Sequence, residues 1–265
     1  MTAEPSGPDE LDELDMQTLI VHRDDRLIAL AKPSGALVHR GWASEGPVLV
    51  DALASWLGAR VHPLHRLDRG TSGVLLFALD EDATRHVGKQ FEASAVDKRY
   101  WALVRGLAPE QAIIDHPLRP HDAKTGKRRK ADDPQAEHRL PAQTLLRRLA
   151  WAPFEDRRYS LVAARPLTGR THQIRRHLKH LAHPIIGDVR YGKGDINRLF
   201  RAQLGLHRLA LHARSLTLEH PDGGLLELRA ALPPDLAGPL AALGITLPEP
   251  PEDDPPLEPE AGLDS

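Results

Sequence analysis

Short apolar runs bounded by polar residues dominate the hydrophobic pattern of this 265-residue chain. Runs of six or seven residues rich in Val, Ile, Leu and aromatic side chains, closed by Gly, Pro or Asp, are typical of β-strands. The pattern therefore predicts strands at 17–22, 26–32, 73–79, 98–104, 159–164, 208–213, 215–220 and 225–230.

Other segments space their apolar residues as an α-helix does. Ile174, Leu178 and Leu181 recur at separations of four and three, which places them on one face of a helix. Asp80 precedes a similar segment and is a candidate N-cap, and Thr171 lies near the start of the helix that contains Ile174. The predicted helices cover 47–58, 80–92, 171–183 and 233–244.

The order of these elements favours one fold class. Strands outnumber helices and do not alternate regularly with them, so a doubly wound parallel sheet is disfavoured. The sequence predicts an α+β protein with a mixed, mainly antiparallel β-sheet and flanking helices. We place this single catalytic domain at 16–247.

Charge is distributed unevenly around this domain. Residues 1–15 and 248–265 hold six and seven acids and no Lys or Arg, and the second of these tails also holds six prolines. Such composition predicts two disordered acidic tails. The remaining chain carries 35 Lys and Arg against 24 Asp and Glu, a formal charge of +11, which favours a polyanionic partner such as a nucleic acid. Within this basic part of the chain, the composition of residues 119–141 predicts a mobile basic loop.

Several classes of protein are excluded or disfavoured by composition. The chain has no cysteine, which excludes disulfides and thiolate chemistry. No apolar run approaches the ~20 residues of a membrane span, and the acidic N-terminus does not resemble a secretory signal. We therefore expect a cytoplasmic protein without a membrane partner. P-loop, dinucleotide-binding and GxSxG motifs do not occur.

The segment HRLDRGTSG (65–73) sets one carboxylate, Asp68, between Arg66 and Arg69. Flanking cations favour the ionised carboxylate, which suits a nucleophile or a base rather than a general acid. The two glycines permit a tight turn and a close approach of the backbone to a ligand. A surface turn with a salt bridge would explain the aspartate and the glycines, but not so many bases.

Two further segments could reach a nucleic acid. In 165–188, five Lys or Arg and four His precede the single acid, Asp188, which is also typical of a solvated helix face. Arg175 and Arg176 are adjacent, so both cannot face the core. In DKRYWALV (97–104) the neighbouring rings of a strand face opposite sides, so one can pack while the other stacks on a nucleobase. Packing of both rings is the alternative.

Together these segments resemble the RluA-type pseudouridine synthases. The matching segments are KPSGALVH (32–39), HRLDRGTSGVLL (65–76), KRYWALVRG (98–106) and TGRTHQIRRHLKHLAHPIIGD (168–188), in the family's order. The resemblance implies the pseudouridine synthase fold with a central RNA-binding cleft, and an enzyme that isomerises a uridine by base flipping. KPSGALVHRGW and HPIIGDVRYGKGDINRLFR (183–201) are most similar to the branch that modifies uridine-65 of tRNA.

The resemblance also implies a role for particular residues. Asp68 is the catalytic nucleophile or base, Arg175 is the basic residue that pairs with it, and Tyr100 contacts the target base. Arg66 takes the place of the flipped base. The expected RNA-binding residues are Arg66, Arg69, Lys98, Arg170, His172 and Arg176.

The chemistry of the residues agrees with this assignment. Pseudouridine formation breaks the N1–C1′ bond of uridine, rotates the uracil and rejoins it through C5, so it needs no redox cofactor, metal or nucleotide. Asp68 could remove the ribose 2′ proton, or attack C1′ or C6, and the sequence leaves all three routes open. We expect an RNA substrate, most simply tRNA, and a monomer without an obligatory protein partner.

Three alternatives have their own tests. A ribosomal RNA pseudouridine synthase of the same family would differ only in substrate. A non-catalytic RNA-binding protein would tolerate Asp68→Asn. A metal-dependent nuclease or hydrolase could use His177, His180 and His183, which are spaced by three, but the surrounding cations and the lack of a nearby carboxylate ligand oppose a metal ion.

Overall fold

The computed structural model describes residues 15–39, 48–120 and 138–247, which form two compact units. The first unit runs to Val96 and also includes Ser215–Ala231, and the second contains the other described residues. Both lie within the catalytic domain predicted at 16–247. The predicted acidic tails lie outside the described residues, apart from Asp15.

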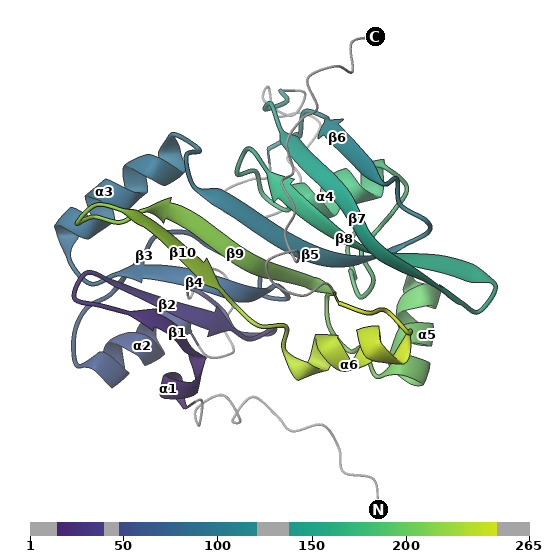
Figure 1. Ribbon diagram of the computed structural model, residues 1–265, viewed down its shortest axis with the longest axis horizontal. Coiled ribbons are helices and arrows are strands. Elements are labelled where there is room, and N and C mark those ends of the chain that lie inside the picture. Colours follow the sequence, from purple (N-terminus) through teal and green to yellow (C-terminus); the bar gives the residue numbers. More distant parts are fainter. Residues whose placement is uncertain (1–14, 40–47, 121–137, 248–265) are drawn as a thin grey trace, which may run out of the picture. The chain divides into compact units, whose positions relative to one another are not determined.

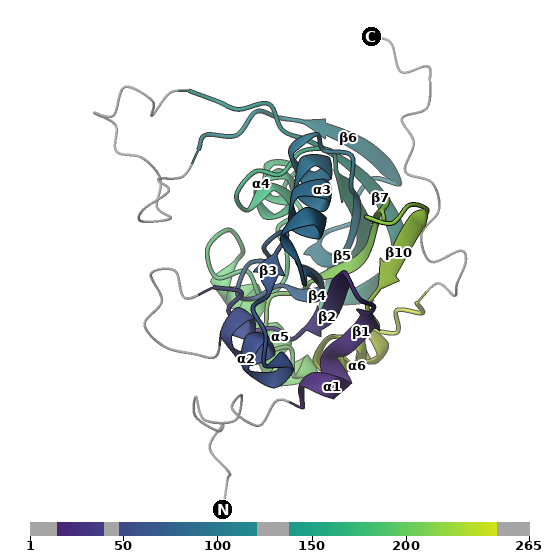
Figure 2. The same ribbon diagram turned by 90° about the vertical axis from the view of Figure 1, so that its left-hand side faces the viewer.

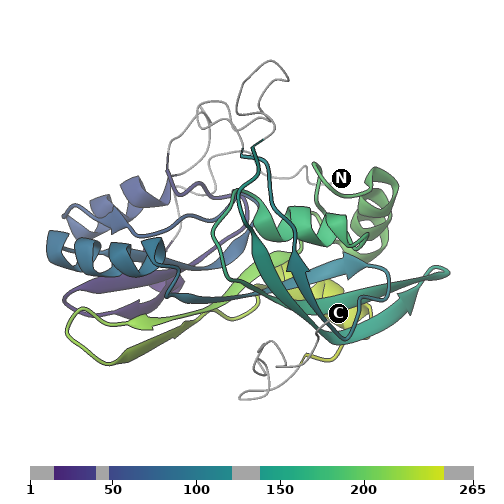
Figure 3. The ribbon, with the colours of Figure 1, turned by 90° about the horizontal axis from the view of Figure 1, so that it is seen from above.

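The first unit is an antiparallel group of strands with helices on one side (Figure 1). Strand β2 lies between β1 and β4, β3 pairs with β4, and β10 pairs with β9. Figures 2 and 3 show α2 and α3 on the same face of these strands. Its elements are α1 (Met16–Leu19), β1 (Ile20–Arg23), β2 (Leu27–Lys32), α2 (Leu49–Leu57), β3 (His62–Pro63), β4 (Ser72–Ala78), α3 (Glu81–Glu92), the end of β9 (Leu211–Glu219) and β10 (Leu225–Arg229).

The core of the first unit forms around β4, in which all seven residues are buried. Val87 of α3 packs in the cluster that contains Val74 and Leu76 of this strand. The predicted N-cap is confirmed, since the Asp80 carboxylate accepts a hydrogen bond from the backbone N–H of Ala83 at 2.8 Å. Burial on both faces makes β4 a rigid base for the loop that precedes it.

The second unit is built on four antiparallel strands in the order β5-β8-β7-β6. Helix α4 lies against β8 and β7. Of the neighbouring rings on β5, Trp101 is buried, and Tyr100 is half-buried and packs against the same core cluster. Its elements are β5 (Asp97–Arg105), β6 (Gln111–Asp115), β7 (Gln143–Phe154), β8 (Arg157–Pro166), α4 (Gln173–His180), α5 (Gly194–Leu204), the start of β9 and α6 (Pro234–Ala242).

Some predicted elements are wrong. Residues 16–19 are helical because the carboxylate of Asp15 accepts a hydrogen bond from the backbone N–H of Gln17 and starts a helical turn before β1. The two strands predicted between 208 and 220 are one continuous strand, β9, which begins at Leu211.

Besides α1, four elements were not predicted, namely β3, β6, β7 and α5. The alternation along β7 is broken by an irregularity between Arg148 and Ala150, so its period is not regular. Helix α5 has no side-chain cap at its N-terminus. Of the predicted basic loop 119–141, residues 121–137 lie outside the described part of the chain, and Leu118 bridges to Leu140 beside it.

Candidate active site

Asp68 lies in the loop that joins β3 to β4 in the first unit. The carboxylate is half-buried, and the preceding Leu67 is buried and anchors the loop. The backbone N–H of Thr71 donates to the carbonyl oxygen of Asp68 at 3.0 Å, which closes a turn. Arg66 and Arg69 are exposed on either side. Arg66 and Arg69 thus lie on either side of Asp68 along the chain, and Nε of Arg69 donates to the carbonyl oxygen of Gly35 at 2.9 Å.

A histidine fixes the start of this loop. Nε2 of His65 accepts a hydrogen bond from the backbone N–H of Leu76 at 3.1 Å. Its ring stacks on Phe91 of α3, with 5.2 Å between centroids and 19° between planes. The segment that leads to Asp68 is thus held by both the strand and the helix of the core.

A buried lysine holds the end of the same loop. Lys32, the last residue of β2, is 1% exposed. Its ammonium donates to the carbonyl oxygens of Pro33 at 2.8 Å, Arg69 at 3.1 Å and Thr71 at 2.8 Å. Three carbonyls from two turns thereby gain a charged donor, and such hydrogen bonds are stronger than those between neutral groups. Lys32 therefore joins the KPSG turn to the Asp68 loop.

We expect Lys32→Met to destabilise the first unit by about 3 kcal/mol, because it leaves buried carbonyl oxygens without their donor. Turnover should fall as well, since the Asp68 loop loses an anchor. Urea unfolding and single-turnover rates check both effects. The matched control is Lys89→Met, which removes an exposed lysine of α3 in the same unit. Equal stability of the two variants would contradict a structural role for Lys32.

The start of α4 in the second unit is organised by a buried glutamine. Gln173 accepts hydrogen bonds at Oε1 from the hydroxyl of Thr168 (2.7 Å) and the backbone N–H of Arg170 (3.0 Å). Its amide donates to Thr144 Oγ1 at 3.0 Å. The N-cap is His172, with a left-handed φ of 54°, and it directly follows Thr171, which the sequence places near the start of the helix. These bonds set the direction of α4.

Arg175 forms a buried ion pair with Asp188. Nε and Nη2 of Arg175 donate to Oδ2 and Oδ1 of Asp188 at 2.7 and 3.0 Å. The backbone N–H groups of Arg190 and Tyr191 also donate to Oδ1, each at 2.9 Å. Burial alone would raise the pKa of Asp188, but Arg175 and these two N–H groups together hold it below its ordinary value. The guanidinium of Arg175 is therefore fixed from one side.

The backbone beside this pair requires glycine. Gly187 has φ of +78°, and a Cβ at this position would lie 1.8 Å from the carbonyl oxygen of Arg208. No side chain can occupy that space without moving the backbone. The close approach explains why a glycine directly precedes Asp188.

Tyr191 contacts two of the predicted site residues, His172 and Arg175. Its hydroxyl lies 3.0 Å from Nδ1 of His172, and the Arg175 and Arg190 guanidinium groups lie 5.2 and 5.7 Å from its ring centroid. Burial raises the pKa of Tyr191, and the neighbouring arginines offset part of this rise. A neutral ring among cations gives favourable cation–π contacts without adding charge.

Tyr100 and Lys98 lie on β5. Tyr100 pairs with Ala164 of β8 and packs at the margin of the second core. Burial lowers the pKa of Lys98, and the charge of Asp97 opposes this shift. The carboxylate of Asp97 also accepts from Nε of Arg165 at 2.6 Å.

The predicted site residues therefore fall into separate groups. Asp68, Arg66 and Arg69 share one loop of the first unit, and the others belong to the second unit. There, Tyr191 contacts His172 and Arg175, whereas Arg170 turns to the carbonyl of Pro141 at 3.0 Å. The residues that sequence reasoning did not single out for the site are Lys32, Gln173, Asp188 and Tyr191. All four lie in segments that carry the family resemblance, which is the signal that could have found them.

The three histidines spaced by three have different surroundings. His177 is fully buried, with Nδ1 2.9 Å from Thr144 Oγ1 and Nε2 3.0 Å from the carbonyl oxygen of His116. Burial is the main cause that lowers its pKa. Nδ1 of His183 lies 2.8 Å from the carbonyl oxygen of Arg105. Within the described ranges, no group of His, Asp and Glu is arranged to hold a metal ion, and no helix could span a membrane.

One known class of enzymes combines a carboxylate loop, a tyrosine on the strand that corresponds to β5 and an arginine-bearing helix. The family model for RNA pseudouridylate synthase matches residues 26–180, which include Asp68, Tyr100 and Arg175. The chain belongs to this family: it is a pseudouridine synthase of the RluA type, an isomerase.

Particular relatives agree with this class. The chain is 44% identical over 215 residues to tRNA pseudouridine synthase C of Haemophilus ducreyi, covering 78% of this chain and 87% of the relative. It is 41% identical over 208 residues to tRNA pseudouridine synthase C of Vibrio cholerae, covering 76% and 85%. The structure of human RNA pseudouridylate synthase domain containing 4 matches with a TM-score of 0.70 at 29% identity, covering 88% of this chain and 96% of that one. The predicted fold class is confirmed.

Proposed function

We propose that this enzyme converts uridine-65 of tRNA to pseudouridine in the cytoplasm, acting as a monomer. The observation that carries the proposal is the 44% identity to a tRNA pseudouridine synthase C over most of both chains. The choice of uridine rests on the resemblance of HPIIGDVRYGKGDINRLFR to the branch of the family that modifies this position. The excess of basic residues between the acidic tails suits a tRNA partner.

In the proposed mechanism the target uridine leaves the RNA stack, which costs a few kcal/mol. Arg66 takes its place, and Arg69, Lys98, Arg170, His172 and Arg176 bind the RNA. The exposure of Arg66 and Arg69 beside the half-buried Asp68 supports their assignment to phosphates or vacated helix space.

Asp68 then promotes cleavage of the N1–C1′ bond, either by removing the 2′ proton or by covalent attack. The uracil rotates and C5 bonds to C1′, while Asp68 returns the 2′ proton or its bond to the substrate breaks. The C5 proton then leaves and N1 gains a proton, so the reaction is an isomerisation. Tyr100 contacts the uracil. Arg175 keeps the role of the family's basic residue in this proposal, and Asp188 orients its guanidinium by accepting from Nε and Nη2.

Tritium release from tRNA labelled at uridine C5 tests the function directly, because the C5 hydrogen is lost only when C5 bonds to the sugar. We expect release in the presence of EDTA, and chemical mapping of the product should place pseudouridine at position 65. Release that maps to another tRNA uridine would contradict the position. Release only from ribosomal RNA would support the alternative substrate, and binding without release from any RNA would overturn the enzymatic proposal.

A further inference from the structure

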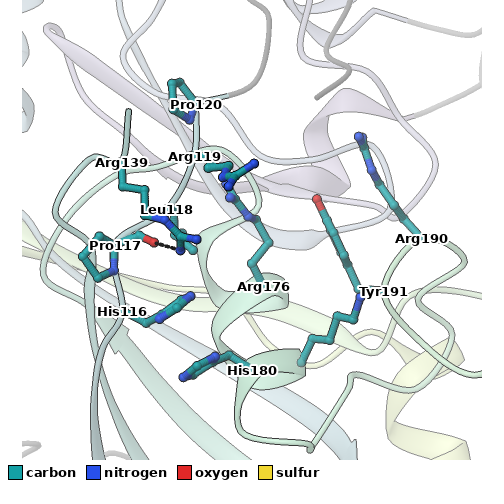
Figure 4. A pocket seen from close by; sticks show the side chains of 11 residues that line it. His116, Pro117, Leu118, Arg119, Pro120, Arg139, Arg176, His180, Arg190 and Tyr191 are labelled. Atoms are coloured by element: carbon teal, nitrogen blue, oxygen red, sulfur yellow. Dashed lines mark hydrogen bonds between the residues drawn. The ribbon is translucent and has the colours of Figure 1, made fainter. Parts of the chain in front are cut away.

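The second unit contains a basic pocket of about 580 Å³ beside α4 (Figure 4). This basic pocket is formed by the turn after β6, the residues that return to β7, the outer side of α4 and the turn before α5. Its lining residues are His116, Pro117, Leu118, Arg119, Pro120, Arg139, Arg176, Lys179, His180, Arg190 and Tyr191. A volume in this range is typical of ligand sites.

Positive charge dominates the lining of the basic pocket. Four arginines and one lysine contribute to it, and none of the eleven lining residues is an acid. Arg208 of the same unit, for comparison, forms an ion pair with Asp235 at 2.9 Å. By contrast, Arg139 and Arg176 donate to carbonyl oxygens at 3.5 Å, which is the long limit of a hydrogen bond.

The cations of the basic pocket repel one another. Burial lowers the pKa of Arg176, and the charges of Arg190 and Arg139 lower it further. Burial also lowers the pKa of His116, and the charges of His180, Arg139 and Arg176 act in the same direction. An anion bound between these groups would relieve the repulsion, since each cation would gain an opposite charge within a few ångströms.

A stacked pair of imidazoles forms part of the wall. The rings of His116 and His180 lie 3.8 Å apart at 14°. Figure 4 shows this pair below Arg176, with Arg139 at the left, Arg119 above, and Tyr191 and Arg190 at the right. Guanidinium and imidazole N–H groups from several directions suit the oxygens of a phosphate group.

We propose that the basic pocket binds a backbone phosphodiester of the substrate RNA at a nucleotide other than the target uridine. Arg139, Arg119 and Arg176 supply the charged donors, and Arg176 is the one RNA-binding residue predicted from sequence that lies in the pocket. This inference rests on the proposed RNA substrate, but not on which uridine is modified.

Helix α4 carries both a proposed catalytic residue and a residue that lines the basic pocket. Arg175 is buried against Asp188, while its neighbour Arg176 lines the pocket. A phosphate held by Arg176 therefore contacts the helix that carries a proposed catalytic residue. Because the contact is to the backbone, it positions the RNA and adds affinity without reading a base.

The test compares Arg139→Gln with Arg201→Gln in the full chain. Arg201 is an exposed arginine of α5 in the same unit and does not line the basic pocket, so the two variants remove the same charge from different places. Each variant is made in the Asp68→Asn background, so that the RNA is bound and not converted. The affinity for tRNA is measured between 50 and 200 mM salt.

We expect Arg139→Gln to weaken binding and to reduce the steepness of its salt dependence. Each phosphate contact makes the affinity fall by a further factor of about three between 50 and 200 mM salt, so the variant should show a decrease smaller by this factor. Arg201→Gln should leave the slope as it is. Equal slopes for Arg139→Gln and its parent, or equal losses of slope in both variants, would overturn the proposal.

A second measurement locates the phosphate. A set of tRNAs with single uncharged methylphosphonate linkages is assayed for binding to the Asp68→Asn protein. We expect a methylphosphonate at one or two positions distant from the target uridine to weaken binding to this protein. The same methylphosphonates should have little effect on binding to the Arg139→Gln variant. If every linkage affects both proteins equally, the proposal is wrong. Since this assay measures binding, it stays informative when tritium release assigns a different uridine.

Discussion

Asp68→Asn is expected to abolish pseudouridine formation while RNA binding persists. The amide has nearly the shape of the carboxylate, but it can neither remove a proton nor form a stable bond to C1′ or C6. Loss of a residue in this role lowers the rate by about 10³-fold or more. The turn should stay intact, because the backbone N–H of Thr71 donates to the backbone carbonyl of Asp68, which the substitution leaves in place.

The measurement is single-turnover tritium release together with the affinity for tRNA. The matched control is Asp25→Asn, an exposed acid of the same unit, which should keep the rate of the unchanged enzyme. Turnover by Asp68→Asn at a similar rate would remove Asp68 from the mechanism. Loss of RNA affinity in step with the rate would show a role in binding rather than in chemistry.

Asp188→Asn is expected to have the largest effect on stability. It leaves the Arg175 guanidinium buried without its carboxylate, and breaking one side of a buried ion pair costs about 3–5 kcal/mol. The rate of tritium release should fall as well, because Arg175 loses the bonds that orient it. Urea unfolding at pH 7 measures the first effect and single-turnover kinetics the second.

The pH dependence of stability separates this role from a simple packing defect. Because the pKa of Asp188 is held below its ordinary value, the pair stabilises the folded protein above a pH of about 4. This stabilisation disappears as the pH falls through the lowered pKa of Asp188. The free energy of unfolding of Asp188→Asn should therefore decrease less over this pH range than that of the unchanged enzyme. Asp156→Asn, an exposed acid of the turn between β7 and β8, is the control. Identical acid unfolding curves for Asp188→Asn and the unchanged enzyme would contradict the ion pair's role.

Much of the fold could be predicted because its signals are local. The strands around Asp68 and Tyr100 are apolar runs with clear ends, and the Asp80 cap acts within a few residues of its own helix. The helices and strands that were predicted wrongly or not at all also have local causes. The turn capped by Asp15 overrides a strand-like pattern, and the irregularity between Arg148 and Ala150 hides the period of β7.

The supports of the candidate site could not be predicted in the same way. Lys32 is a charged residue at a strand end, and its burial depends on carbonyls that lie 37 and 39 residues further along the chain. The pairing of Arg175 with Asp188 joins a helix to the turn beyond it. Spacing along one element says nothing about such contacts, because they form only when separate segments pack together.

By itself, the sequence determined the chemistry of this protein: a carboxylate between arginines, an aromatic strand beside bases, and motifs that identify the enzyme class. These are properties of residue types at short spacing. Only the tertiary structure decided which charges lie together. Arg175 pairs with Asp188, and Arg119, Arg139 and Arg176 come from distant segments to line one basic pocket. The reason is that charge neutralisation acts through space over a few ångströms, and the distance along the chain does not measure it.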